Sequence, residues 1–134
     1  MAETGSKTVV DRVGRVAVPV TDQDAAIAFY TEKLGFSLAA DIDAGGYRWV
    51  EVAPPGGGTT LAIVPPPEGG PTGIDTNVIL TTDDADEALG ELRSRGVDVD
   101  DEVSRMGGPV PPMFWFRDPE GNKLLIVEDR GPQQ

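Results

Sequence analysis

Residues 22–64 of this chain read DQDAAIAFYTEKLGFSLAADIDAGGYRWVEVAPPGGGTTLAIV, and the same layout returns once, further along the sequence. An aspartate opens each copy, at Asp22 and at Asp84, and a short apolar run closes it, LAIV in the first copy and LLIV in the second. The aspartates lie 62 residues apart, Trp49 and Trp115 lie 66 apart, and the closing runs lie 63 apart. An offset this constant over most of the chain indicates a duplicated supersecondary unit.

The first copy predicts one strand, one helix and three further strands. Valines between residues 13 and 20 predict the first strand, and Asp22 suits the N-cap of a helix that Gly35 ends. The sequence then predicts three more strands, at residues 36–42, 47–53 and 60–64. The unit is therefore βαβββ.

The second copy repeats this order after the proline-rich residues 65–71, which we interpret as part of a linker between the halves. Its predicted elements are a strand at 74–82, a helix from Asp84 to Gly96, a strand at 97–103, and a hairpin of strands at 113–116 and 123–127. The hairpin turns at residues 118–121, where proline in the second position and glycine in the fourth suit a type I turn with a bulge.

These elements predict a single α+β domain made of two modules. We expect a lead-in at residues 1–10, a first βαβββ module at 11–66, a linker at 67–73, a second module at 74–130 and a tail at 131–134.

Composition predicts a compact and strongly acidic protein. The 134 residues suffice for one buried core, and 11 basic against 23 acidic residues give a net charge of −12. Phosphate binding needs clustered Lys and Arg, so a nucleic-acid partner is disfavoured. No apolar run approaches the ~20 residues of a membrane span, and the polar first residues lack the apolar core of a signal peptide. We therefore expect no membrane contact and a cytoplasmic location. The charge either serves solubility or attracts a cationic ligand.

The lack of histidine and cysteine in the sequence excludes several kinds of catalytic site. Without histidine there is no Ser-His-Asp triad, and without cysteine there is neither a thiolate nucleophile nor a disulfide. The acidic cluster at 83–87 suits a helix N-terminus, and the one at 98–102 suits a solvated strand face better than a calcium site. The glycine-rich residues 54–58 lack the Lys-Ser/Thr ending of a phosphate loop. A carboxylate acid/base site remains open only at Glu51, for which the spacing suggests no second acid.

Several short motifs, taken in order, resemble the vicinal oxygen chelate superfamily, which groups glyoxalases, bleomycin-resistance proteins and extradiol dioxygenases. The motifs are Val18-Pro19-Val20-Thr21-Asp22, Phe29-Tyr30, Leu34-Gly35-Phe36, and Asp118-Pro119-Glu120-Gly121-Asn122 followed by Leu124 to Glu128. The resemblance spans nearly the whole chain. It implies that the two βαβββ modules pair into an open, cup-shaped mixed β-barrel, usually in a homodimer, with a metal or an organic ligand in the cup.

The resemblance also identifies four positions that carry metal ligands in metal-dependent relatives. They lie on the first and last strand of each module, here at Arg15, Ala62, Asn77 and Leu125. Alanine and leucine donate nothing, arginine is a permanent cation, and asparagine offers only a neutral oxygen. We therefore expect no metal and no cofactor in this chain.

Strand alternation predicts which residues line the cup. In the hairpin Trp115 lies opposite Leu125 and Met113 opposite Val127, and opposite residues share a face. Repeat symmetry adds Trp49 on the same face as Ala62, and alternation adds two neighbours of Trp49. The predicted ligand-binding residues are Arg15, Tyr47, Trp49, Glu51, Asn77, Met113 and Trp115.

Two of these assignments keep an alternative. Each tryptophan suits ordinary barrel core as well as a ligand pocket. Arg15 on an inward face needs an anionic partner, which is either a ligand or a local acid such as Glu51.

Three functions follow from this sequence, and we favour the first. It is a metal-free protein that binds a small aromatic or cationic molecule in the cup, as in the sequestration of a drug or metabolite. The second is a glyoxalase-like lyase or isomerase, or a dioxygenase-related enzyme, although the usual metal-ligand positions are not retained and no catalytic residue is assigned. The third is a structural or regulatory dimer whose cup is closed by its own side chains.

Overall fold

The computed structural model describes residues 7–129 of the chain, so residues 1–6 of the predicted lead-in and the predicted tail lie outside the described residues. The first half contains one helical segment between four strands. Its elements are β1 (Arg15–Pro19), α1 (Gln23–Ala28), the π-helical turn η1 (Phe29–Lys33), β2 (Ser37–Asp43), β3 (Arg48–Ala53) and β4 (Thr60–Val64). Asp22 caps α1, its side chain accepting from the Ala25 backbone N–H at 3.0 Å. The N-cap predicted from the sequence is confirmed.

The second half repeats the order of the first. Its elements are β5 (Asp75–Thr82), α2 (Ala85–Ser94), β6 (Asp98–Val99), β7 (Met113–Arg117) and β8 (Lys123–Glu128). Asp84 caps α2 by accepting from the Glu87 backbone N–H at 3.1 Å, as Asp22 does in the first half. No helix among the described residues is long and apolar enough to cross a bilayer.

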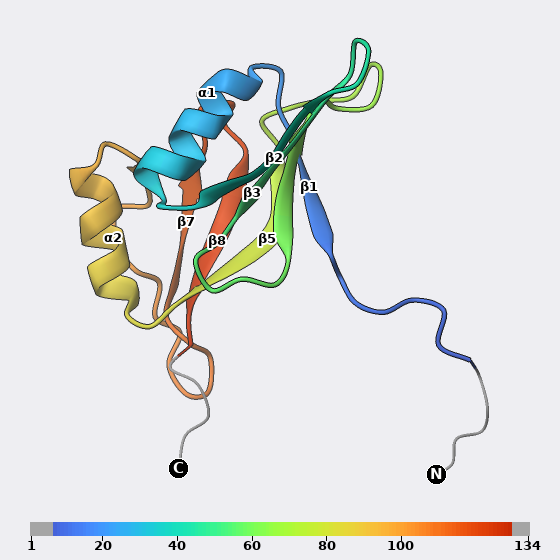
Figure 1. Ribbon diagram of the computed structural model, residues 1–134. Coiled ribbons are helices and arrows are strands. Elements are labelled where there is room, and N and C mark those ends of the chain that lie inside the picture. Colours follow the sequence, from blue (N-terminus) through green and yellow to red (C-terminus); the bar gives the residue numbers. More distant parts are fainter. Residues whose placement is uncertain (1–6, 130–134) are drawn as a thin grey trace.

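Each half forms its own four-stranded sheet, in the order β1-β4-β3-β2 and β5-β8-β7-β6. In both sheets the first strand pairs parallel to the last, and the remaining pairs are antiparallel. Figure 1 shows α1 and α2 on the same side of the molecule, with the sheets beside them. The predicted duplicated α+β fold is confirmed, and within one chain the two sheets stay open and do not close into a barrel.

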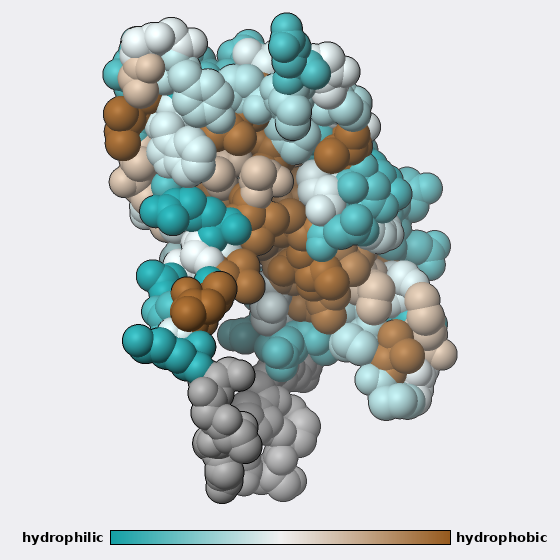
Figure 2. Space-filling model, turned by 90° about the vertical axis from the view of Figure 1, so that its right-hand side faces the viewer, coloured by the Kyte–Doolittle hydropathy of each residue, from teal (hydrophilic) through white to brown (hydrophobic). Residues whose placement is uncertain are grey.

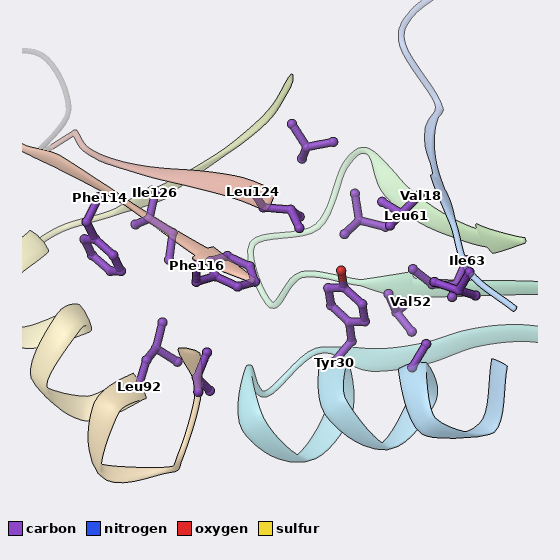
Figure 3. Packing of buried hydrophobic residues seen from close by; sticks show 14 of the residues in the cluster. Val18, Tyr30, Val52, Leu61, Ile63, Leu92, Phe114, Phe116, Leu124 and Ile126 are labelled. Atoms are coloured by element: carbon purple, nitrogen blue, oxygen red, sulfur yellow. The ribbon is translucent and has the colours of Figure 1, made fainter. Parts of the chain in front are cut away.

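The core lies between the helices and the faces of the sheets that they cover. Alternate strand residues point into it, among them Val18, Val52 and Ile63 from the first half and Phe114 and Leu124 from the second. Figure 3 shows Tyr30, which is fully buried, pointing from its helix toward the sheets in the middle of this core, with Phe114 farther along, toward α2 and Leu92. Both halves therefore share one apolar core, which is what fixes them as a single domain.

The predicted strand at residues 97–103 is wrong beyond Val99. Asp100 keeps one ladder hydrogen bond, from its backbone N–H to the Trp115 carbonyl at 3.1 Å, but its carboxylate and not its carbonyl accepts from the Trp115 backbone N–H at 3.0 Å, and it also accepts from Arg117 Nη2 at 2.9 Å. Its backbone carbonyl, and that of Asp101, accept from Arg93 Nη2 on α2. The acidic run was expected to form a solvated strand face, but Asp100 instead ends the strand by hydrogen bonding.

The turn between β7 and β8 joins the two halves, and we call residues 118–122 the interhalf turn. Asp118 organises it, because one carboxylate oxygen accepts from the backbone N–H groups of Glu120 and Asn122, each at 2.9 Å. The other oxygen accepts from the Tyr30 hydroxyl of the first half at 3.0 Å. Burial, together with the nearby Asp118 charge, raises the pKa of Tyr30 well above its usual value, so this hydroxyl remains a donor.

Two further residues of the interhalf turn bind the first half directly. Asn122, fully buried, donates from Nδ2 to the Pro19 carbonyl at 2.8 Å and accepts from the Ile74 N–H at 3.0 Å. Glu120 accepts from the backbone N–H groups of Thr21 and Asp22 at 3.0 and 2.9 Å. The turn can form because Gly121 adopts a φ of +86°, which suits glycine.

Asn122→Ala should destabilise the protein strongly. The substitution leaves the Ile74 N–H and the Pro19 carbonyl without their partner, and we expect a loss of about 2–4 kcal/mol in the free energy of unfolding. Urea denaturation followed by circular dichroism measures it. The other asparagine supplies the control, because Asn77 is exposed and has a φ of +61° that glycine also adopts. Equal effects of Asn122→Ala and Asn77→Gly would contradict the role of Asn122.

Glu120 should make the stability depend on pH in the acid range. Burial opposes ionisation of Glu120, but the N–H groups of Asp22 and Thr21 outweigh it and hold its pKa below the ordinary value of a glutamate. A carboxyl whose pKa is lower in the folded state contributes stability above its ordinary pKa, and this contribution is lost as pH falls through the folded value. We expect Glu120→Gln to narrow the difference in melting temperature between pH 6 and pH 3, two conditions that bracket the ordinary carboxyl pKa of about 4.3. An unchanged difference would show that other carboxyl groups carry the dependence.

Candidate functional site

The predicted site residues lie on the sheet faces that point away from the helices, which we call the helix-free faces. In the first sheet β3 alternates between Val50 and Val52, which are buried in the core, and Trp49 and Glu51, which point the other way. Register places Glu51 opposite Ala62, and Trp49 therefore shares a face with Ala62, as the repeat symmetry predicts.

A buried carboxylate, Glu51, organises the helix-free face of the first sheet. Its Oε2 accepts from Arg15 Nε and from Trp49 Nε1, both at 2.6 Å. Its Oε1 accepts from the Thr60 hydroxyl at 2.9 Å. The Arg15 guanidinium first, and then the Trp49 indole N–H, hold the pKa of Glu51 below its ordinary value against the opposing effect of burial. Glu51 is therefore a structural anion at neutral pH and not a raised-pKa acid or base.

The ion pair between Arg15 and Glu51 is asymmetric in its exposure. The Glu51 side chain is 10% exposed, whereas the Arg15 side chain is 58% exposed. Of the two partners considered for Arg15, the structure supplies the local acid. The guanidinium nevertheless reaches the surface of the helix-free face.

The second sheet carries the other tryptophan on its helix-free face. Trp115 pairs with Leu125 and Met113 with Val127, so the predicted cross-strand pairs are confirmed. Lys123 Nζ lies 4.5 Å from the centre of the Trp115 ring, within reach of a cation–π interaction.

Asn77 lies where β5 departs from its regular ladder. The register with β8 shifts between Asp75 and Ile79, and Asn77 takes a left-handed φ of +61°. Ile79, just after the irregularity, is 61% exposed. In register Ile79 lies opposite Leu125, so the two side chains share the helix-free face of the second sheet.

The structure brings the predicted residues together in two groups. Arg15, Trp49 and Glu51 are joined by hydrogen bonds, and the Tyr47 ring lies 6.5 Å from that of Trp49. Met113 and Trp115 form the second group on β7. Between residues 7 and 129, no hydrogen bond, ion pair or ring contact joins the first group to the second or to Asn77.

The structure also contains a hollow that the sequence does not predict. It has a volume of about 730 Å³ and lies between the β3–β4 turn and β1 of the first half and β5 and α2 of the second. Of the predicted site residues only Asn77 lines it; much of the remaining wall is apolar, including Val16, Phe36, Leu80, Leu92 and Ile126. Figure 2 shows hydrophobic residues gathered in the middle of one face of the molecule, with hydrophilic residues around them.

The hollow is the symmetry counterpart of the interhalf turn. The repeat offsets relate Tyr30 to Leu92 and Asn122 to Thr59, and both Leu92 and Thr59 line the hollow. Residues 54–57 of the β3–β4 turn also line it, but they are two prolines and two glycines and carry none of the polar side chains of residues 118–122. The lack of polar side chains at residues 54–57 is the feature of the sequence that could have predicted the hollow.

The four positions that bear metal ligands in metal-dependent relatives do not fit a transition metal here. Arg15 is a cation bonded to Glu51, Ala62 and Leu125 have no donor atoms, and Asn77 has one neutral oxygen. Across residues 7–129, no group of three or more His, Cys, Asp or Glu side chains is placed to hold a metal ion.

Comparison with known proteins agrees with the fold and the order of motifs. Residues 12–126 match the family model of the Glyoxalase/Bleomycin resistance protein/Dioxygenase superfamily. TnmS3, an antibiotic binding protein from Streptomyces sp. CB03234, is 35% identical with a TM-score of 0.78, over 91% of this chain and 98% of that one. A member of the same superfamily from Sphaerobacter thermophilus DSM 20745 is 34% identical with a TM-score of 0.84, over 91% of this chain and all of that one. The Bacillus subtilis (strain 168) protein YetH is 33% identical over 122 residues, which are 90% of this chain and 100% of YetH.

The match covers both modules and extends from β1 to β8. It agrees with the duplicated βαβββ order, the paired aspartate caps and the turn at residues 118–122. The chain belongs to the Glyoxalase/Bleomycin resistance protein/Dioxygenase superfamily.

Proposed function

We propose that this protein binds a small organic molecule, with an aromatic part, on its helix-free faces and without a metal. The observation that carries the proposal is the composition of these faces, which present Trp49 and Trp115 beside few polar groups and no set of metal donors. Sites for organic ligands combine aromatic walls with a few placed polar anchors. The similarity to TnmS3, described as an antibiotic binding protein, supports sequestration as the use of such a site.

The helix-free faces suit this role better than the hollow does. The first sheet supplies a polar group held in place, because Arg15, Trp49 and Thr60 all bond to Glu51. In the hollow the polar side chains are Asn77, Glu91 and three threonines at the edge of apolar walls. Specific recognition needs polar groups whose direction is fixed, and the described chain fixes them on the helix-free face.

We further propose that two copies of the chain form a homodimer that completes the cup. In one chain the helix-free faces leave large apolar side chains exposed, with Ile79 at 61%, Ile42 at 54% and Tyr47 at 44%. Ile42 pairs with Trp49 in register and so shares its face. Placing the face of one sheet against that of a second copy would cover these side chains and bring a Trp49 group close to a Trp115 group.

Ligand binding should change the emission of the tryptophans. We expect a panel of aromatic molecules, including bicyclic and tricyclic drugs, to contain members that shift or quench the fluorescence, with calorimetry confirming binding. Trp49→Leu and Trp115→Leu should each weaken binding by about three- to tenfold, the usual contribution of one aromatic contact. Met106→Leu, in an exposed loop, is the control and should bind normally. A panel without any binding partner would argue for the dimer with a closed cup.

Ile79→Asp should convert the dimer into monomers. A carboxylate buried against a second copy is left without a partner, which is costly in an apolar interface. Sedimentation velocity measures the change, and circular dichroism verifies that the variant is folded. Met106→Asp introduces the same charge at a residue that is 71% exposed outside the sheets, and it should remain dimeric. A monomeric wild-type protein at micromolar concentration would refute the assembly but not ligand binding.

A further inference from the structure

We propose that the ligand carries an acidic group, a carboxylate or an ionised phenol, and that the free edge of the Arg15 guanidinium binds it. This inference rests on the proposed function and specifies the chemical class of the ligand. It also decides between the two classes that the sequence leaves open, since it assigns an aromatic acid and not an aromatic cation.

The first support is the number of donors that Arg15 leaves unused. A guanidinium has five N–H donors in one plane, one on Nε and two on each Nη. Nε donates to Glu51 at 2.6 Å, and neither Nη atom donates a hydrogen bond among residues 7–129. The side chain is 58% exposed, so the edge formed by Nη1 and Nη2 is accessible from the helix-free face. Two parallel N–H groups match the two oxygens of a carboxylate.

The second support is the rigidity of the group that holds Arg15. Glu51 is itself fixed, because Oε2 accepts from Trp49 Nε1 at 2.6 Å and Oε1 from the Thr60 hydroxyl at 2.9 Å. Since Glu51 is 7% exposed and ionised, it restrains the guanidinium in one orientation before any ligand arrives. A donor that is already oriented loses less entropy on binding than a free surface arginine.

The third support is the local charge. The one carboxylate in this cluster is buried and has its hydrogen bonds to three donors, so it has little left to offer a cation. A cationic ligand against Trp49 would lie beside Arg15 and be repelled by it. The net charge of −12 acts over the whole surface, but at physiological salt such charges are screened beyond about 8 Å. Direct contact with the guanidinium therefore outweighs the overall charge.

The second sheet shows why we assign Arg15 and not Lys123. Lys123 also lies beside a tryptophan, with Nζ 4.5 Å from the centre of the Trp115 ring. However, it is paired in register with Asp75 on β5, so an acid is already close to it. Arg117 on the same face is bonded to Asp100. Arg15 differs from both residues, because its acidic partner Glu51 is buried while its own guanidinium is exposed.

The test compares three probes that share a naphthalene ring and carry an anionic, a neutral or a cationic group at position 2: 2-naphthoate, 2-naphthamide and 2-naphthylmethylammonium, each titrated into the full-length protein by calorimetry. We expect 2-naphthoate to bind at least about tenfold more tightly than the amide, because its hydrogen bonds to Arg15 are charge-assisted. The ammonium probe should bind most weakly. Equal binding of the three probes, or tightest binding of the ammonium probe, would overturn the inference while leaving the proposed function intact. If none of the three probes binds although members of the aromatic panel do, the inference is overturned and the proposed function stands; if the panel also contains no binding member, the proposed function fails with it.

Variants locate the preference at Arg15. The double variant Arg15→Gln with Glu51→Gln removes both charges and leaves no buried ion unpaired, and it should bind naphthoate and naphthamide equally. Arg15→Lys keeps the charge without the fork of donors and should retain part of the preference. Arg12→Gln removes the same charge from an exposed residue that forms an ion pair with Asp11, and the preference should be unchanged. A preference that survives in the double variant would show that another cation binds the acid. Melting temperatures measured alongside verify that each variant is folded.

Discussion

The structure depends on one buried carboxylate, Asp118, at the turn that joins the two halves. A buried ion is tolerated only when its hydrogen-bonding capacity is satisfied, and Asp118 meets this condition with donors from its own turn and from Tyr30 of the first half. Because those donors come from both halves, Asp118 keeps all of its hydrogen bonds only when the two halves lie in this relative position. The apolar core supplies most of the driving force for folding, but apolar contact is not directional. The direction comes from this turn.

Glu51 uses the same device for a different purpose. It too is a buried acid, but its three donors are all side chains of one sheet, so it orders a surface and not the contact between the halves. The consequence is that a guanidinium and an indole N–H, from Arg15 and Trp49, are bonded to the same carboxylate oxygen on the helix-free face. The two buried acids thus have different roles. Asp118 fixes the position of the halves, and Glu51 orients the polar side chains on the helix-free face of the first half.

The sequence was sufficient for most of the fold, and for physical reasons. Repetition makes each half a check on the other, and local signals such as the aspartate caps and the turn at residues 118–121 depend on neighbours in the chain. The cross-strand pair of Trp115 and Leu125 could be counted from that turn. The end of β6 could not be predicted, because Asp100 bonds to Arg117, 17 residues away. Nor could sequence spacing tell whether the two groups of site residues meet, since it determines the face of a sheet and not how one sheet lies against another.

The two symmetry-related joints between the halves are unequal, and this inequality bears on how such a protein diverges. At the interhalf turn, any replacement of Asp118 or Asn122 leaves a buried polar atom without its hydrogen-bond partner. Selection for stability therefore acts directly on each of these residues. On the other side the hollow is lined mostly by apolar side chains, prolines and glycines, where a change of size is absorbed by open space. Duplication gave rise to both contact regions, but only the interhalf turn contains buried polar groups whose hydrogen bonds had to be preserved. Drift should therefore accumulate around the hollow, and descendants that share the joint at Asp118 should differ most in the width of this opening.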